Sequence, residues 1–328
     1  MKLYSIELTY INVYIDNYAD FLRVHLTRLI AYAESSDVTL QREVAEKIAN
    51  EAVKSVRQVQ IVEFGGLKLL IPLTKSVDAE VQRLASHALA NLSVNADNQR
   101  LMANNGAIES LIPLLETKHD LIQRQAAKAL ANLGVNAENK RKIALAGGIP
   151  KLVHLCRDCT IPVKIECIAA LANLAVNDEN EMEIIREEGH TPILQALQIA
   201  ESGKRSSHMG YTPENMEELC AQCCRSLRNL SVNHQNKAVL IKGIYSICFV
   251  CIEFFFIQNF IHAFYVFVYS ILGGALPLLL SCASSNNDRV AQQAHRALRN
   301  LNQDNEEMDL KTAASMVTPE GRSGSFRK

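Results

Sequence analysis

The stretch ALANLSVNADN, residues 88–98, decides how this chain folds, because the sequence repeats it. It returns as ALANLGVNAEN at 129–139 and as ALANLAVNDEN at 170–180, each time after 41 residues. A divergent copy, SLRNLSVNHQN, occupies 226–236, and ALRNL at 297–301 ends the series. A period of about 20 to 50 residues is typical of solenoids, whose units pack only against their neighbours. We therefore expect a repeat array.

Each unit is predicted to contain three helices. In the unit that ends in the second copy, a short first helix over 98–105 stops at Gly106, where glycine supplies a left-handed cap. A second helix over 107–116 contains Pro113, which removes one backbone hydrogen bond and is expected to bend it. A long third helix over 121–135 follows, with small alanines on its packing side. The sequence thus predicts an all-α fold.

The array is predicted to run over 25–302, as about six units with the first and last incomplete. Residues 1–24 do not match the repeat and are interpreted as a strand or an irregular cap. The segment 200–216 is rich in Gly, Ser, Lys and Pro and lengthens its unit, so we expect an exposed loop there. The tail, 303–328, is charged and then Gly- and Ser-rich, which predicts disorder.

A second insertion, 244–272, is long and apolar enough to span a membrane. It nevertheless interrupts a unit at its glycine corner, and removing thirty residues restores the 41-residue period. The codons for Gly-Ile at its start and Leu-Gly at its end admit a GT splice donor and an AG acceptor. We interpret the segment as a translated intron or a gene-model error. A membrane hairpin or span and a family-specific helical insertion are the alternatives.

Composition excludes several classes of function. The 328 residues have a formal net charge of −1, which gives no signal for nucleic acid. The sequence has no Gly-rich phosphate loop, no HExxH and no nucleophile elbow, so we predict that the chain is not an enzyme and takes no cofactor. No signal peptide is evident. We expect a cytoplasmic protein, associated with a membrane only if 244–272 is genuine; no pattern predicts an oligomeric state.

The nine cysteines are predicted to be buried, reduced thiols. Two Cys-x-x-Cys pairs, at 156–159 and 220–223, look like halves of a zinc site. They belong to different units, however, and the second pair falls on a helix. No metal site is predicted.

The pattern Ala-Leu-x-Asn-Leu-x-x-Asn-x-x-Asn, followed by an apolar helix and then Gly-Gly/Ala-Ile/Leu-Pro-x-Leu, resembles the armadillo repeat. The resemblance covers 25–243 and 273–302. The repeats are similar to those of the vacuolar armadillo protein, the armadillo-repeat kinesins and the cilium-associated armadillo proteins alike. The resemblance implies a right-handed α-solenoid of three-helix armadillo repeats. It also implies that the third helices line a concave groove that binds extended protein segments.

Side chains at positions i, i+4 and i+8 of each third helix lie on roughly one face. Asparagine recurs at the last position, and its amide offers a donor and an acceptor to an extended peptide backbone. The resemblance places that role on Asn91, Asn132, Asn173 and Asn229. The basic side chains of the same face are Arg83, His87, Arg124, Lys128, Arg225 and Arg296. They favour an acidic or phosphorylated partner segment, although some could equally be solvated surface charges.

The asparagines just beyond the third helices have a structural explanation instead. Asparagine near a helix end commonly satisfies local backbone groups or caps the next helix. We expect this of two series: Asn95, Asn136, Asn177 and Asn233, and Asn98, Asn139, Asn180 and Asn236.

The leading hypothesis is a non-enzymatic protein-binding scaffold. Importin-α-like adaptors hold basic signals between tryptophans, and this chain has no Trp, so a nuclear-import function is not expected. The alternative is an armadillo protein anchored in a membrane through 244–272, which would tether an organelle or membrane.

Overall fold

The computed structural model describes residues 18–205, 212–233, 235–236, 239–240, 275–285 and 287–302. Within these ranges the chain forms helices and turns and no strand, which confirms the predicted all-α fold. Most of the predicted N-terminal cap, part of the 200–216 loop, the insertion 244–272 and the tail lie outside the described residues. The chain divides into two units, Met1–Leu174 and Ala175–Lys328.

The first unit contains the repeats most clearly visible in the sequence. Its helices are α2 (Tyr18–Ala33), α3 (Val38–Ala52), α4 (Ser55–Glu63), α5 (Leu67–Leu73), α6 (Ala79–Leu92), α7 (Ala96–Asn104), α8 (Ala107–Leu111), η1 (Ile112–Glu116), α9 (Asp120–Leu133), α10 (Ala137–Leu145), α11 (Gly148–Arg157) and α12 (Ile161–Leu174). From α4 to α12, each repeat has two shorter helical segments followed by one long third helix, in agreement with the predicted three-helix order.

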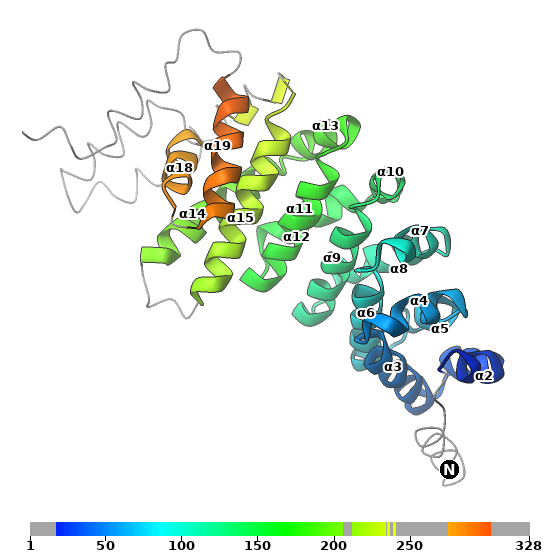
Figure 1. The fold of residues 1–328 in the computed structure, drawn as a ribbon. Helices are drawn as coiled ribbons and strands as arrows, with labels where there is room; N and C mark the ends of the chain where they lie inside the picture. The colour runs from blue at the N-terminus through cyan, green and yellow to red at the C-terminus, as the bar shows by residue number, and fades with distance from the viewer. Residues whose placement is uncertain are drawn as a thin grey trace, which may run out of the picture. The chain divides into compact units, whose positions relative to one another are not determined.

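The long third helices α3, α6, α9 and α12 pack in succession, each against the next, as Figure 1 shows. The first helices α4, α7 and α10 also pack in succession. Fully buried alanines such as Ala88 and Ala129 allow the close approach, and Leu89 and Leu130 fill the space between helices. Every repeat of the first unit thus buries its apolar side chains against the neighbouring repeats, as a solenoid requires.

The corner between first and second helices depends on a left-handed residue. Gly65, Gly106 and Gly147 have φ of 86°, 84° and 76°. Their counterpart in the second unit, 41 residues after Gly147, is Glu188 with φ 58°. Positive φ suits glycine and costs other L-residues about 1–2 kcal/mol, so the predicted corner is confirmed and one copy of it is strained.

The second helix of the repeat around Pro113 covers the predicted range 107–116 and is disturbed at the proline, as expected, so that it is not one continuous α-helix. It runs as α8 to Leu111 and continues as the 3-10 helix η1. Proline has no N–H to donate to the helical carbonyl four residues back, and the tighter turns accommodate that loss. Pro72, by contrast, lies inside α5.

The second unit contains α13 (Asp178–Arg186), α14 (His190–Arg205), α15 (Pro213–Leu230), α18 (Ala275–Ala283) and α19 (Asp288–Asn302). Helix α15 packs against α14 and α19, and α18 packs against α19. The helices α14 and α15 extend into the predicted loop 200–216 from both sides. Thr212 caps α15 by accepting a hydrogen bond from the Asn215 backbone N–H, with Pro213 at the first helical position. Among the described helices, none combines the length and apolarity needed to cross a bilayer.

Candidate partner-binding surface

The third-helix face of the first unit is the candidate surface, defined as the solvent-accessible side chains of α3, α6, α9 and α12. Helical spacing places Arg83, His87 and Asn91 in one row on α6, and Arg124, Lys128 and Asn132 in the corresponding row on α9. All six are half-buried or exposed, so a partner can reach them.

The asparagine ladder joins consecutive repeats. Asn132 Nδ2 donates to the Ala90 carbonyl at 3.4 Å and to Ser93 Oγ at 3.1 Å, and Asn173 Nδ2 donates to the Ala131 carbonyl at 2.7 Å. Each bond satisfies groups near the end of the preceding third helix, where carbonyls lack helical partners. The structure therefore gives these asparagines a role in packing that the sequence prediction did not include.

The ladder amides retain hydrogen-bonding capacity. A carboxamide has two N–H donors and an oxygen with two lone pairs. Asn173 uses one donor, and within the described residues Oδ1 of Asn132 and of Asn173 accepts no hydrogen bond. Asn91 Nδ2 lies 3.1 Å from His87 Nε2. The oxygens can accept a hydrogen bond from a peptide N–H while the repeats stay joined.

The second unit places its predicted residues differently. Asn229 is buried, with 8% of its surface exposed, and its Oδ1 accepts from Arg228 Nε and Nη2 at 2.9 and 2.7 Å. Asn300 Nδ2 donates to the Arg228 carbonyl at 3.0 Å. Burial lowers the pKa of Arg225, and the nearby charges of Arg289 and Arg228 lower it further. Arg296 is exposed. Here the asparagine position is mostly occupied by contacts within the unit.

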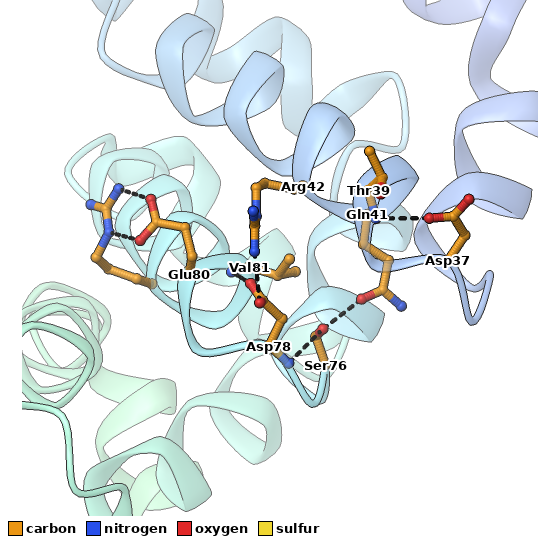
Figure 2. A network of polar contacts seen from close by, with 9 residues as sticks. Asp37, Thr39, Gln41, Arg42, Ser76, Asp78, Glu80 and Val81 are labelled. Carbon is orange, nitrogen blue, oxygen red and sulfur yellow. Dashed lines mark hydrogen bonds and ion pairs between the residues drawn. The ribbon is translucent and has the colours of Figure 1, made fainter. Parts of the chain in front are cut away.

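The arginines of the face form ion pairs with neighbouring carboxylates. Arg42 Nη2 contacts Asp78 Oδ2 at 2.8 Å (Figure 2). Arg83 Nε and Nη2 donate to the two carboxylate oxygens of Glu80, each at 2.7 Å. Arg124 Nε lies 3.8 Å from Glu166 Oε1. The face is therefore mixed in charge. The i, i+3 spacing of Glu80 and Arg83 would have revealed one of these pairs from the sequence.

The Asp78 carboxylate has a structural role as well as an electrostatic one. It caps α6 by accepting from the Val81 backbone N–H at 3.0 Å, and this bond and Arg42 hold its pKa below the ordinary value (Figure 2). The hydrogen bonds from Arg83 likewise lower the pKa of Glu80. Both acids are charged at neutral pH.

His87 lies between two cations. Burial lowers its pKa, and the nearby charges of Arg83 and Lys128 lower it further, against a hydrogen bond with Gln125. The side-chain ammonium of Lys128 makes no hydrogen bond or ion pair with any other described residue. Arg83, His87 and Lys128 are termed the cationic cluster below: Arg83 is paired with Glu80, whereas Lys128 has no carboxylate partner among the described residues.

The predicted capping role is confirmed for Asn95, Asn136 and Asn177, whereas Asn98 and Asn139 also bond to the preceding repeat. Asn95 Oδ1 accepts from the backbone N–H of Asp97 at 2.9 Å, and Asn136 and Asn177 cap α10 and α13 in the same way. Asn98 is fully buried and donates to the Gln58 and Leu92 carbonyls at 3.0 and 3.1 Å. Asn139 Nδ2 makes the equivalent bond to the preceding repeat by donating to the Gln99 carbonyl.

These features match a known class of repeat protein. The family model described as Armadillo-like matches residues 23–201, which is more than half of the chain. The chain belongs to the Armadillo-like family. A comparison with curated proteins finds no match.

Solved structures agree with the family. A crystal structure of an engineered protein has a TM-score of 0.65 and 25% identity, covering 84% of this chain and 95% of that one. A designed armadillo repeat protein in complex with peptide (KR)4 has a TM-score of 0.62 and 22% identity, with coverage of 84% and 98%. A structure from work on the phosphorylation switch between cadherin and β-catenin has a TM-score of 0.62 and 16% identity, covering 88% of this chain and 47% of that one. The chain is an armadillo-repeat scaffold by fold, and its finer likeness to vacuolar, kinesin or ciliary members stays a prediction.

Proposed function

We propose that this chain binds an extended acidic or phosphorylated segment of a partner protein along the third-helix face of its first unit. The single observation that carries the proposal is the cationic cluster. Arg83 and Lys128, from consecutive repeats, lie near enough to one neutral imidazole to lower its pKa, and an anionic side chain seated there would relieve their mutual repulsion.

The ion pairs on the face do not block such a partner. Arg83 and Glu80 are 34% and 46% exposed at their side chains, and exposed pairs of this kind contribute only about 0–1 kcal/mol. A phosphate or carboxylate that brings several backbone contacts with it can displace Glu80 from Arg83. Among the described residues, no carboxylate pairs with Lys128.

The amide ladder supports an extended backbone as the ligand. Asn91, Asn132 and Asn173 stand one repeat apart on adjacent helices. Their oxygens and remaining N–H groups present a row of acceptors and donors, as the main chain of a strand-like segment requires. Among relatives by fold, one designed protein is complexed with a basic peptide, and the cadherin–β-catenin interaction is controlled by phosphorylation. The cations of this chain favour an acidic or phosphorylated ligand over a basic one.

The predictions for Arg225, Asn229 and Arg296 concern the second unit and are separate from this proposal. The partner itself is identified here only by its chemistry.

The test is fluorescence anisotropy of the full chain with three labelled peptides: one rich in Asp and Glu, one phosphorylated, and one of alternating Lys and Arg. We expect the two anionic peptides to bind and the affinity to fall with salt. Lys128→Glu should weaken binding roughly tenfold or more. Lys142→Glu is the matched control, because Lys142 lies on the first helix α10 and contacts Asn104. Equal losses in both variants, or preferred binding of the basic peptide, would contradict the proposal.

A further inference from the structure

Three cysteines of the second unit come together in its interior. Cys220 and Cys224 are one helical turn apart on α15, and Cys282 reaches them from α18. All three are buried, and their sulfur atoms lie within 4.8 Å of one another. Cys220 Sγ and Cys282 Sγ are 3.3 Å apart. Only Cys220 belongs to a Cys-x-x-Cys pair, so sequence spacing alone could not single out this group.

A buried carboxylate completes the group. Glu201, on α14, is 9% exposed, and its Oε1 lies 3.6 Å from Cys220 Sγ and 3.5 Å from Cys282 Sγ. Its other oxygen, Oε2, accepts a hydrogen bond from Ser281 Oγ at 2.7 Å. Four potential metal ligands thus converge from three helices.

We propose that Cys220, Cys224, Cys282 and Glu201 form a structural zinc site. Zinc in closed sites takes four ligands in a tetrahedron, drawn from thiolates, imidazoles and carboxylates. Three sulfurs and one oxygen supply a full set, leaving no position for a substrate. The expected role is to join α14, α15 and α18.

The distances fit a tetrahedron. With Zn–S of about 2.3 Å and Zn–O of about 2.0 Å, the edges are about 3.8 Å between sulfurs and about 3.5 Å between sulfur and oxygen. The observed S–O separations, 3.6 and 3.5 Å, match that edge. The 3.3 Å between Cys220 and Cys282 needs to open by about half an ångström, a small side-chain rotation.

The surroundings fit as well. The hydroxyl of Ser281 orients Glu201 as an outer-shell partner would, leaving Oε1 directed at the sulfurs. Binding of Zn²⁺ releases three thiol protons to solvent and forms three Zn–S bonds and one Zn–O bond.

A second cysteine group in the first unit serves as an internal comparison. Cys156, Cys159 and Cys167 also lie close together, but the ammonium of Lys164 is near them, donating to the Cys156 carbonyl. A fixed cation repels Zn²⁺. Cys223 is buried on α15 next to the proposed site but is not part of the group of three sulfurs.

The experiment measures metal content of the full chain purified with and without added Zn²⁺. One zinc per chain is expected. In chain stripped of zinc, Co²⁺ should give sulfur-to-metal charge-transfer absorption and the visible bands of a tetrahedral site. Cys224→Ala and Glu201→Gln should abolish or sharply weaken binding, and Ser281→Ala should weaken it roughly tenfold through the outer shell. Cys223→Ala is the control and should leave the stoichiometry unchanged.

Two results would overturn the proposal. One is reduced, folded wild-type chain that takes up neither Zn²⁺ nor Co²⁺. The other is a disulfide between two of the three cysteines in chain purified from reducing cells, shown by mass spectrometry. Because the Co²⁺ spectrum is recorded on the wild type, the result stands even if a variant fails to fold.

Discussion

At the scale of single residues, His87 connects the structure of the third-helix face to a measurable property. Its pKa lies below the ordinary 6.5 because it is partly buried between Arg83 and Lys128. The imidazole is thus neutral at pH 7 in the free chain. A bound carboxylate would reverse the local field and raise that pKa.

We therefore predict that the affinity for a peptide rich in Asp and Glu increases, roughly threefold, as pH falls from about 8 to about 6. Binding that raises the pKa of His87 takes up a proton, so acid favours the complex. Titration of anisotropy with pH measures this, and His87→Gln should flatten the curve. A phosphopeptide is unsuitable, because phosphate itself titrates near pH 6.

The depressed pKa of His87 affects the folding stability of the free chain with the opposite pH dependence. A histidine with a depressed folded pKa binds its proton more readily when unfolded, so its contribution to stability is fully present above pH 6.5 and declines below it. His190, whose pKa burial also lowers, acts in the same direction. The binding prediction for His87 would be contradicted if the folded wild-type chain bound the acidic peptide more weakly at pH 6 than at pH 8.

At the scale of helices, the asparagines separate into those that join repeats and those that can also meet a partner. Asn98 is fully buried and holds carbonyls of two different helices through one amide nitrogen. Asn91 is half-buried, and its side chain bonds only to the His87 side chain within the described residues.

Asn98→Ala should lower the free energy of unfolding by about 1–3 kcal/mol, because two buried carbonyls lose their donor. Asn91→Ala should change it by less than about 1 kcal/mol. Chemical denaturation followed by circular dichroism measures both. Similar losses in the two variants would show that the ladder residue Asn91 is as structural as the buried Asn98.

Much of this fold was predictable from the sequence. The period, the glycine corners and the three-helix order follow from spacing, because each unit must bury the same faces in the same way. A disturbance at Pro113 was also predictable, because proline lacks an N–H, although its form as a 3-10 segment was not. The continuation of α14 to Arg205 was not predictable, since the composition of that segment is typical of a loop. In the candidate site, the rows of Arg83 and Asn91 follow from helical geometry. The pairing of Arg124 with Glu166 and the gathering of Cys282 with Cys220 require side-chain positions that no one-dimensional pattern contains.

At the scale of the whole chain, the register on either side of the apolar insertion is informative. Asn173 donates to a carbonyl 42 residues earlier in the first unit, and Asn300 makes the equivalent bond 72 residues back in the second. The difference is the thirty residues that the sequence period marks as extra. Helices α15 and α19 thus pack as consecutive third helices although the insertion separates them in sequence.

We predict that chain lacking residues 244–273 folds with an unchanged or higher melting temperature, and that the mature transcript lacks the corresponding thirty codons. Sequencing of messages across the codons for Lys242 and Gly274, and thermal denaturation of the shortened chain, are the two measurements. Uniform presence of the codons in mature messages would reject the intron interpretation. Unfolding of the shortened chain would show that the insertion belongs to the protein.

The ladder bond has one further consequence, for the history of the molecule. The side-chain amides of Asn132, Asn173 and Asn300 each donate to a main-chain carbonyl of the preceding third helix, and every residue type carries that acceptor. Consecutive repeats therefore need no matched pair of side chains at this contact. A duplication or loss of one 41-residue segment would leave each new neighbour with an acceptor in the right place, so copy number can change in a single genetic event without a second, compensating mutation there.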